Sequence, residues 1–145
     1  EALRINPDYA DAQYNMGVVL EMRGDQEGAI RHLSEAVRLN PVHAVAHYDL
    51  GNLFAIQGRF DEAVRHLTEA ANLQPDGGVP ACYNLACIHA RQNREEQAVY
   101  WLKKAVERGF VRWDLLRNDN DMENIRENTY YKDLISSHET GVGPD

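Results

Sequence analysis

The chain has 145 residues, a formal net charge of −8 and an ordinary globular composition, with 43% hydrophobic and 26% charged residues. The acidic balance and the lack of a basic stripe argue against nucleic acid as the main partner, because phosphate binding needs clustered lysine and arginine. No apolar run reaches the roughly 18 residues that a membrane helix requires. We therefore expect no membrane partner and a cytoplasmic protein.

The first residues, Glu1–Pro7, match the later segment Glu35–Pro41 and lack the basic-then-apolar pattern of a signal peptide. We expect residues 1–6 to be the end of a helix from a preceding unit. The sequence is then expected to begin inside a longer array.

From Asn6 onward the sequence repeats. The prolines at positions 7, 41 and 75 lie 34 residues apart, and the segment Tyr14–Gly17 recurs as Tyr48–Gly51 and, altered, as Tyr83–Ala86. Three further columns recur at intervals of 34 and then 35 residues: Ala29, Ala63 and Ala98; Leu33, Leu67 and Leu102; and Ala36, Ala70 and Ala105. A fixed period of this length is typical of stacked repeats, in which each unit buries its apolar face against its neighbours.

One period predicts two helices joined by a turn. Asn40-Pro41 is expected to end one helix and to begin the next, with Asn40 as the N-cap. Gly58 supplies the left-handed residue that ends the first helix. Gly17 and Gly51 stand in the middle of first helices, where glycine costs about 1 kcal/mol relative to alanine. That cost, repeated at one position, predicts close approach of the second helix.

The elements Tyr-x-x-Gly, Gly-x-x-x-x-Ala, Leu-x-x-Ala and Asn-Pro resemble the tetratricopeptide repeat, over residues 7 to about 109. The resemblance implies an all-α fold, a right-handed superhelical solenoid of antiparallel helix pairs whose first helices line a concave groove. The sequence departs from the pattern at Gln26, where an aromatic is commoner, at Asn93, where Gly24 and Gly58 stand in the other repeats, and at one extra residue within Asp76–Pro80.

The expected organisation follows from these boundaries: residues 7–40, 41–74 and 75–109 as three repeats, 110–136 as C-terminal capping helices, and 137–145 as a disordered tail. After Gly109 the period fails, and short helices are expected at Phe110–Leu116, Asp119–Ile125 and Thr129–Ile135. A solenoid end exposes an apolar face, so a cap with polar outer residues is the expected role of this segment. A hook for a specific partner is the alternative.

Motifs for catalysis, cofactors and metals are weak, and we expect no enzyme activity, no cofactor and no metal site. His43 and His47 lie one helical turn apart, but two ligands without a third make a poor zinc site. Cys82 and Cys87 are five residues apart on one helix, which turns them roughly 140° away from each other. They are expected to be small buried thiols rather than a disulfide. Cys87 and His89 point to different sides and make no nucleophile pair.

The better candidate is the peptide-binding groove that the resemblance implies. Its expected lining is given by the exposed sides of the three first helices: Tyr14, Asn15, Val18 and Met22; then Tyr48, Asp49, Asn52 and Ile56; then Tyr83, Asn84, Cys87 and Arg91. Asparagine can pair with the backbone of an extended peptide whatever its side chains. The tyrosines either add flat contact area for a ligand or pack between helices, and both interpretations remain open, as they do for Asn15 and Asn84.

The asparagines look like a partial version of the ladder in the O-GlcNAc transferase repeats, interrupted by Asp49. The carboxylate clamp that other members of the family use for acidic C-termini needs lysines and an arginine, and only Arg91 approaches that chemistry. A neutral or basic peptide is therefore the expected partner.

Three hypotheses follow. The first is a non-catalytic protein–protein interaction module that binds a protein segment in its groove. The second is a self-assembly module that forms a homo-oligomer through exposed repeat faces. The third is the targeting region of a larger enzyme, such as a glycosyltransferase.

Overall fold

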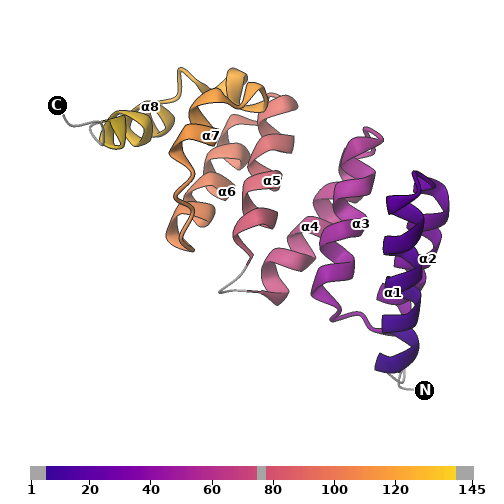
Figure 1. The fold of residues 1–145 in the computed structure, drawn as a ribbon. Helices are drawn as coiled ribbons and strands as arrows, with labels where there is room; N and C mark the ends of the chain where they lie inside the picture. Colours follow the sequence, from indigo (N-terminus) through magenta and orange to yellow (C-terminus); the bar gives the residue numbers. More distant parts are fainter. Residues whose placement is uncertain (1–5, 75–77, 140–145) are drawn as a thin grey trace, which may run out of the picture. The chain divides into compact units, whose positions relative to one another are not determined.

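The computed structural model describes residues 6–74 and 78–139 of the chain, and every regular element in those residues is helical (Figure 1). The repeats supply six helices in consecutive pairs: α1 Pro7–Met22 with α2 Gln26–Leu39, α3 Ala44–Ile56 with α4 Phe60–Leu73, and α5 Val79–Arg91 with α6 Glu95–Glu107. The segment after them adds α7 Trp113–Asn118, the 3-10 helix η1 Asn120–Ile125 and α8 Thr129–Ser137. The expected all-α architecture of stacked helix pairs is confirmed. The expected helix end in residues 1–5 lies outside the described residues.

The chain forms two compact units, residues 1–75 and residues 76–145. The boundary coincides with the segment Asp76–Pro80, in which the sequence carries one residue more than the other repeats. The first unit holds the helix pairs α1/α2 and α3/α4. The second holds α5/α6 together with the C-terminal segment.

The turn within each pair depends on one left-handed residue. Gly24 and Gly58 have φ angles of 82° and 74°, and Asn93 takes the same place in the third pair with a φ of 58°. Asparagine tolerates this conformation better than most residues that carry a Cβ. The short turns place the two helices of each pair antiparallel.

The predicted close approach at the repeated glycines is confirmed. A Cβ built on Gly17 would lie 2.8 Å from Cγ of Leu33, and one built on Gly51 would lie 2.7 Å from Cγ of Leu67. Leu33 and Leu67 are fully buried, so they form the core between the helices of their pairs. The glycines are therefore packing residues.

Asn40 does not cap the helix that follows it. It is the C-cap of α2, and α3 begins only at Ala44, where His43 is the N-cap and its Nδ1 accepts a hydrogen bond of 3.2 Å from the backbone N–H of Ala46. Asn6, in the first Asn-Pro pair, does act as an N-cap, because its side chain accepts a hydrogen bond from the backbone N–H of Tyr9 at the start of α1. The Asn-Pro motif thus begins a helix at Asn6 and ends one at Asn40.

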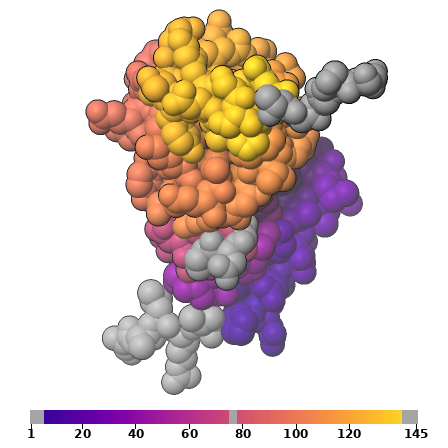
Figure 2. Space-filling model, turned by 90° about the vertical axis from the view of Figure 1, so that its left-hand side faces the viewer, coloured from indigo at the N-terminus to yellow at the C-terminus, as the bar shows by residue number. Residues whose placement is uncertain are grey.

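The C-terminal segment contains three short helices, as the sequence predicts, with shifted bounds. The first starts at Trp113 rather than Phe110, and the second is a 3-10 helix. The outer residues of α8 are polar. The buried side chains of the whole C-terminal segment include Leu116, Met122, Ile125, Tyr131 and Leu134. Ser137 belongs to α8 rather than to the expected disordered tail, and residues 140–145 lie outside the described residues. In the space-filling view the orange and yellow atoms of this segment form one continuous mass (Figure 2).

None of the helices in the described residues is long and apolar enough to cross a membrane.

Candidate functional site

The predicted groove residues of the first unit separate into two groups by exposure. Asn15, Met22 and Ile56 are exposed, whereas the other five are half-buried: Tyr14, Val18, Tyr48, Asp49 and Asn52. All eight lie on α1 and α3, the two first helices of this unit. Side-chain contacts join the two helices, including a hydrogen bond of 3.0 Å that Nε2–H of His43, the N-cap of α3, donates to the carboxylate of Asp11 on α1.

Tyr14 and Asp49 bond to each other. The hydroxyl of Tyr14 donates to the carboxylate of Asp49 at 3.0 Å, and the Tyr14 ring lies against His43 with 5.0 Å between ring centroids. Burial, followed by the hydrogen bond to Asp49, raises the pKa of Tyr14 to about 12. Burial also raises the pKa of the Asp49 carboxyl. This corrects the expectation that Asp49 is free to meet a ligand, because its carboxylate already joins two repeats.

Met22 and Ile56 are the most exposed apolar side chains of the predicted groove. They occupy equivalent repeat positions 34 residues apart, and 82% and 66% of their surfaces are exposed. Each lies at the C-terminal end of its helix. Internal packing does not account for two large apolar side chains at this position.

The second unit differs from the sequence prediction. Tyr83 and Cys87 are buried, with 7% of each exposed, because the C-terminal segment lies over this side of α5. The hydroxyl of Tyr83 donates to Asp119 at 2.6 Å, and Sγ of Cys87 lies 3.7 Å from the same carboxylate. Tyr83 therefore packs within the fold, which is one of the two interpretations left open for the tyrosines, and Cys87 is the buried thiol that the sequence predicts, so neither side chain of this expected groove lining is open to a ligand. Arg91 is exposed and pairs with Asp121 at 3.7 Å, while Asn84 is half-buried.

Asp119 repeats the role of Asp49. Tyr14 and Tyr83 are equivalent in the repeat, and their acceptors follow them by 35 and 36 residues. Asn128 and Gln57 also make similar hydrogen bonds, each to a glutamate on the second helix of a pair. The amide of Gln57 donates to Glu27 on α2 at 3.0 Å, and the amide of Asn128 donates to Glu95 on α6 at 2.7 Å.

Residues 119–128 therefore repeat two polar contacts of a first helix, but not its packing, because η1 lies mainly against α5, whereas α3 lies against α2. The sequence pattern alone missed this relationship, because only Asp119 and its spacing from Tyr83 preserve the repeat.

The histidines that the sequence offers as metal candidates have structural partners. His47 is buried; its Nε2 lies 2.9 Å from the carbonyl of Pro41 and its Nδ1 lies 3.1 Å from Nδ1 of His66. Because a carbonyl only accepts, Nε2–H of His47 donates and its Nδ1 accepts from His66. In the first repeat the equivalent pair is Gln13 and His32, 2.7 Å apart. Burial lowers the pKa of His66 to about 4.

Cys87, Asp119 and Asp121 bring one sulfur and two carboxylate oxygens within 4.8 Å of one another. A metal would need the thiolate, and burial, followed by the charge of Asp119, raises the pKa of the Cys87 thiol. The Asp119 carboxylate also accepts from the backbone N–H of Asp121 at 2.9 Å. The cluster is explained as hydrogen bonding that fastens the C-terminal segment.

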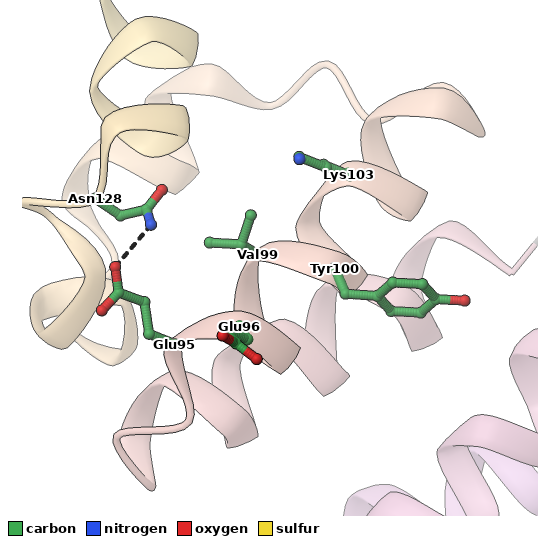
Figure 3. Close-up of a pocket in the computed structure, with 6 residues that line it drawn as sticks. All are labelled: Glu95, Glu96, Val99, Tyr100, Lys103 and Asn128. Atoms are coloured by element: carbon green, nitrogen blue, oxygen red, sulfur yellow. Dashed lines mark hydrogen bonds between the residues drawn. The ribbon is translucent and has the colours of Figure 1, made fainter.

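An open cavity of about 510 Å³ lies beside α6, where α8 begins (Figure 3). Its lining combines opposite charges with apolar surface: Glu95, Glu96, Val99, Tyr100, Lys103 and Asn128. In the close-up, the dashed hydrogen bond joins Asn128 to Glu95 on one side, and Tyr100 points away from them. None of the predicted groove residues lines this cavity.

Comparison with family models agrees with the repeat pattern. A model described as "Tetratricopeptide repeat" matches residues 43–108, another with that description matches residues 1–31, and one described as "TPR repeat" matches residues 22–58. A comparison with curated proteins finds no match.

Solved structures of similar fold include the crystal structure of MamA, with 27% sequence identity, a TM-score of 0.66, and coverage of 71% of this chain and 60% of that one. A second MamA structure has 25% identity and a TM-score of 0.65, with coverage of 76% and 58%. The chain thus spans about three fifths of the length of these MamA chains.

Two further structures share the fold at lower identity. YrrB, described as a TPR protein with an unusual peptide-binding site, has 24% identity and a TM-score of 0.64, covering 81% of this chain and 57% of that one. The N-terminal domain of stress-induced protein-1 from C. elegans has 18% identity and a TM-score of 0.67, covering 88% and 97%.

Proposed function

The chain belongs to the tetratricopeptide repeat family, and we propose that it is a non-catalytic interaction module that binds an extended protein segment on α1 and α3. The family is in general a non-enzymatic fold of protein interaction. YrrB, which shares the fold, is described as having a peptide-binding site.

The observation that carries the proposal is the exposure of Met22 and Ile56 at equivalent ends of neighbouring first helices. Two apolar side chains one repeat apart would bury surface against a ligand that lies across both helices. Burial of apolar area is the main favourable term in such binding.

Polar side chains beside Met22 and Ile56 would orient the bound segment. Asn15 is exposed on α1, and Asn52 is half-buried on α3. Each amide offers both a donor and an acceptor, which suits the N–H and C=O groups of an extended backbone. A ligand held in this way would be read mainly through its backbone, with apolar side chains over Met22 and Ile56.

Charge favours a neutral or basic segment. The chain carries a net charge of −8, and the exposed residues of α1 include Asp8, Asp11 and Glu21. Electrostatic complementarity of this kind acts chiefly on specificity and the rate of encounter. An acidic segment would meet like charge.

The test begins with selection from a library of random linear peptides on the full chain, followed by calorimetric titration of the enriched peptides. The variant Asn15→Ala/Asn52→Ala removes two amides and should weaken binding by about 1–3 kcal/mol, the range for two net hydrogen bonds. Asn72→Ala is the matched control, because Asn72 is exposed on α4 of the same unit.

Failure to enrich any peptide would reject the function. Unchanged affinity in the double variant would reject the role of the two asparagines. Enrichment of acidic peptides over neutral and basic ones would contradict the proposed charge preference.

A further inference from the structure

A second open cavity, of about 360 Å³, is lined by residues of α7, of the C-cap of η1 and of α8. Its lining combines three positive side chains with a phenol, a hydroxyl and one aliphatic side chain: Arg117, Arg126, Lys132, Tyr131, Ser136 and Ile135. Among the described residues, no acidic side chain lines it. In a chain of net charge −8, this lining has the opposite sign to the molecule as a whole.

The two arginines of the cavity lack a carboxylate partner. Within the part of the chain that the structure describes, neither Arg117 nor Arg126 forms an ion pair. Nη2 of Arg126 donates to the backbone carbonyl of Asp119 at a long 3.5 Å, and its buried Nε has no hydrogen-bond partner. The carboxylate of Asp119 instead accepts from the hydroxyl of Tyr83 at 2.6 Å. An oxygen acceptor brought to the Arg126 guanidinium would offset the cost of its unpaired donor.

The third positive side chain has a weakly held partner. Nζ of Lys132 lies 2.7 Å from a carboxylate oxygen of Glu127, and the two side chains are 55% and 90% exposed. Such exposed pairs contribute little free energy, and the ammonium has three donors, so it can also serve a second anion.

The balance of charge selects the kind of anion. Three positive side chains and the carboxylate of Glu127 leave two net positive charges at the cavity. A phosphate monoester carries close to two negative charges at neutral pH, because its second pKa is about 6. A single carboxylate would leave one positive charge without a counterion.

The walls of the cavity are held together by Tyr131. Its hydroxyl donates to the backbone carbonyl of Leu116 at 3.0 Å, which ties α8 to α7, and its side chain is buried. Burial raises the pKa of Tyr131, and the nearby positive charges of Arg126 and Arg117 act in the opposite direction. The helices that carry Arg117 and Lys132 are thus joined before a ligand arrives, which reduces the ordering that binding requires.

We propose that this cavity binds a phosphate monoester, with Arg117, Arg126 and Lys132 holding the phosphate and the organic group lying on Ile135. A guanidinium offers paired N–H donors that match two phosphate oxygens, and the hydroxyl of Ser136 adds a donor. The volume falls within the range of small-molecule sites. The site lies in the second unit, outside the repeats, so it is independent of the peptide surface on α1 and α3.

The first test is calorimetric titration of the full chain with three anions. Phenyl phosphate is the probe, inorganic phosphate has the same charge without an organic group, and benzoate has the same ring with a single charge. Phenyl phosphate should bind most tightly. Benzoate should bind at least about tenfold more weakly, because one charge-assisted hydrogen bond is worth about 1.5–3 kcal/mol.

The second test uses variants at exposed positions, with the fold of each checked by circular dichroism. Arg117→Gln/Lys132→Gln should weaken phenyl phosphate at least about tenfold. Lys103→Gln/Arg112→Gln is the matched control, because it removes the same charge from exposed residues of the same unit that do not line the cavity, and it should bind as the wild type does. Glu127→Gln frees Lys132 and should strengthen binding by roughly two- to fivefold.

The absence of measurable phenyl phosphate binding would overturn the proposal. Benzoate binding as tight as that of phenyl phosphate would overturn the preference for a dianion. Inorganic phosphate binding as tight as that of phenyl phosphate would overturn the contact with the organic group and make the site one for the free ion. An equal loss of affinity in the two double variants would overturn the position of the site.

Discussion

The hydroxyl of Tyr14 and the carboxylate of Asp49 are joined by a hydrogen bond of 3.0 Å across 35 residues of sequence. The bond links the first helix of one repeat to the first helix of the next. Tyr83 and Asp119 repeat it at 2.6 Å, although Asp119 lies beyond the last repeat. One polar contact thus serves both to join repeats and to fasten the C-terminal cap.

Removal of the Tyr14 hydroxyl should destabilise the first unit. Tyr14→Phe keeps the ring but leaves the half-buried Asp49 carboxylate without this donor, which should lower the free energy of unfolding by about 1–3 kcal/mol. Urea denaturation checks the value. Tyr9→Phe is the control, since Tyr9 is exposed at 53% and its loss of a hydroxyl should have little effect. Equal stability of Tyr14→Phe and wild type would show that the bond contributes nothing.

The cap predicts a change in thiol reactivity. Cys87 is 7% exposed beneath Asp119, so Asp119→Ala should loosen the covering segment and speed the reaction of Cys87 with a maleimide. Cys82 is fully buried on the same helix and gives an internal reference. Mass spectrometry of the labelled peptides separates the two sites. A rate at Cys87 that stays the same as in the wild type would contradict the fastening role of Asp119.

The packing of the helix pairs predicts the cost of a larger side chain at Ala63. This residue is fully buried in the pair α3/α4, where Gly51 and Leu67 show how closely the helices approach. Ala63→Leu should overpack the seam and cost about 1–3 kcal/mol. Thermal denaturation followed by circular dichroism measures the effect. An unchanged melting transition would reject the assignment of this seam.

The histidine pair predicts a loss of stability in acid. The pKa of His66 is lowered from 6.5 to about 4 in the folded chain, so the unfolded chain binds a proton more readily. Stability from this group is complete above about pH 6.5 and is lost as the pH falls from there towards about 4. His66→Gln keeps a donor for His47 but cannot titrate, and it should flatten the stability difference between pH 7 and pH 5.

The control for this prediction is His138→Gln, at an exposed histidine of the second unit. It should leave the pH dependence of the first unit as it is in the wild type. If His66→Gln shows the full wild-type slope, the acid sensitivity comes from other groups.

Sequence predicted the features that depend on period and backbone conformation. The helix pairs, the close approach at Gly17 and Gly51, and the left-handed turns at Gly24 and Gly58 all follow from residue type and spacing. These are local requirements repeated in register, so each repeat supports the assignment of the others.

The sequence did not predict which of the expected groove residues would instead contact other residues of the chain. Asp49 is polar and lies on the expected face, yet it accepts from a tyrosine 35 residues away. Tyr83 and Cys87 are covered by a segment outside the period, whose packing depends on Asp119 and a 3-10 helix. Such contacts depend on tertiary placement, which periodicity alone does not give.

The most direct test of the proposed binding surface is the affinity of a library-selected peptide for Met22→Ser/Ile56→Ser, compared with Val42→Ser. Val42 is the matched control, because it is an apolar residue of the same unit, 58% exposed and outside the predicted groove. The double variant should bind at least about tenfold more weakly, a change of about 1.4 kcal/mol for lost apolar contact, while Val42→Ser binds as the wild type does. Equal affinities for all three proteins would contradict binding on α1 and α3.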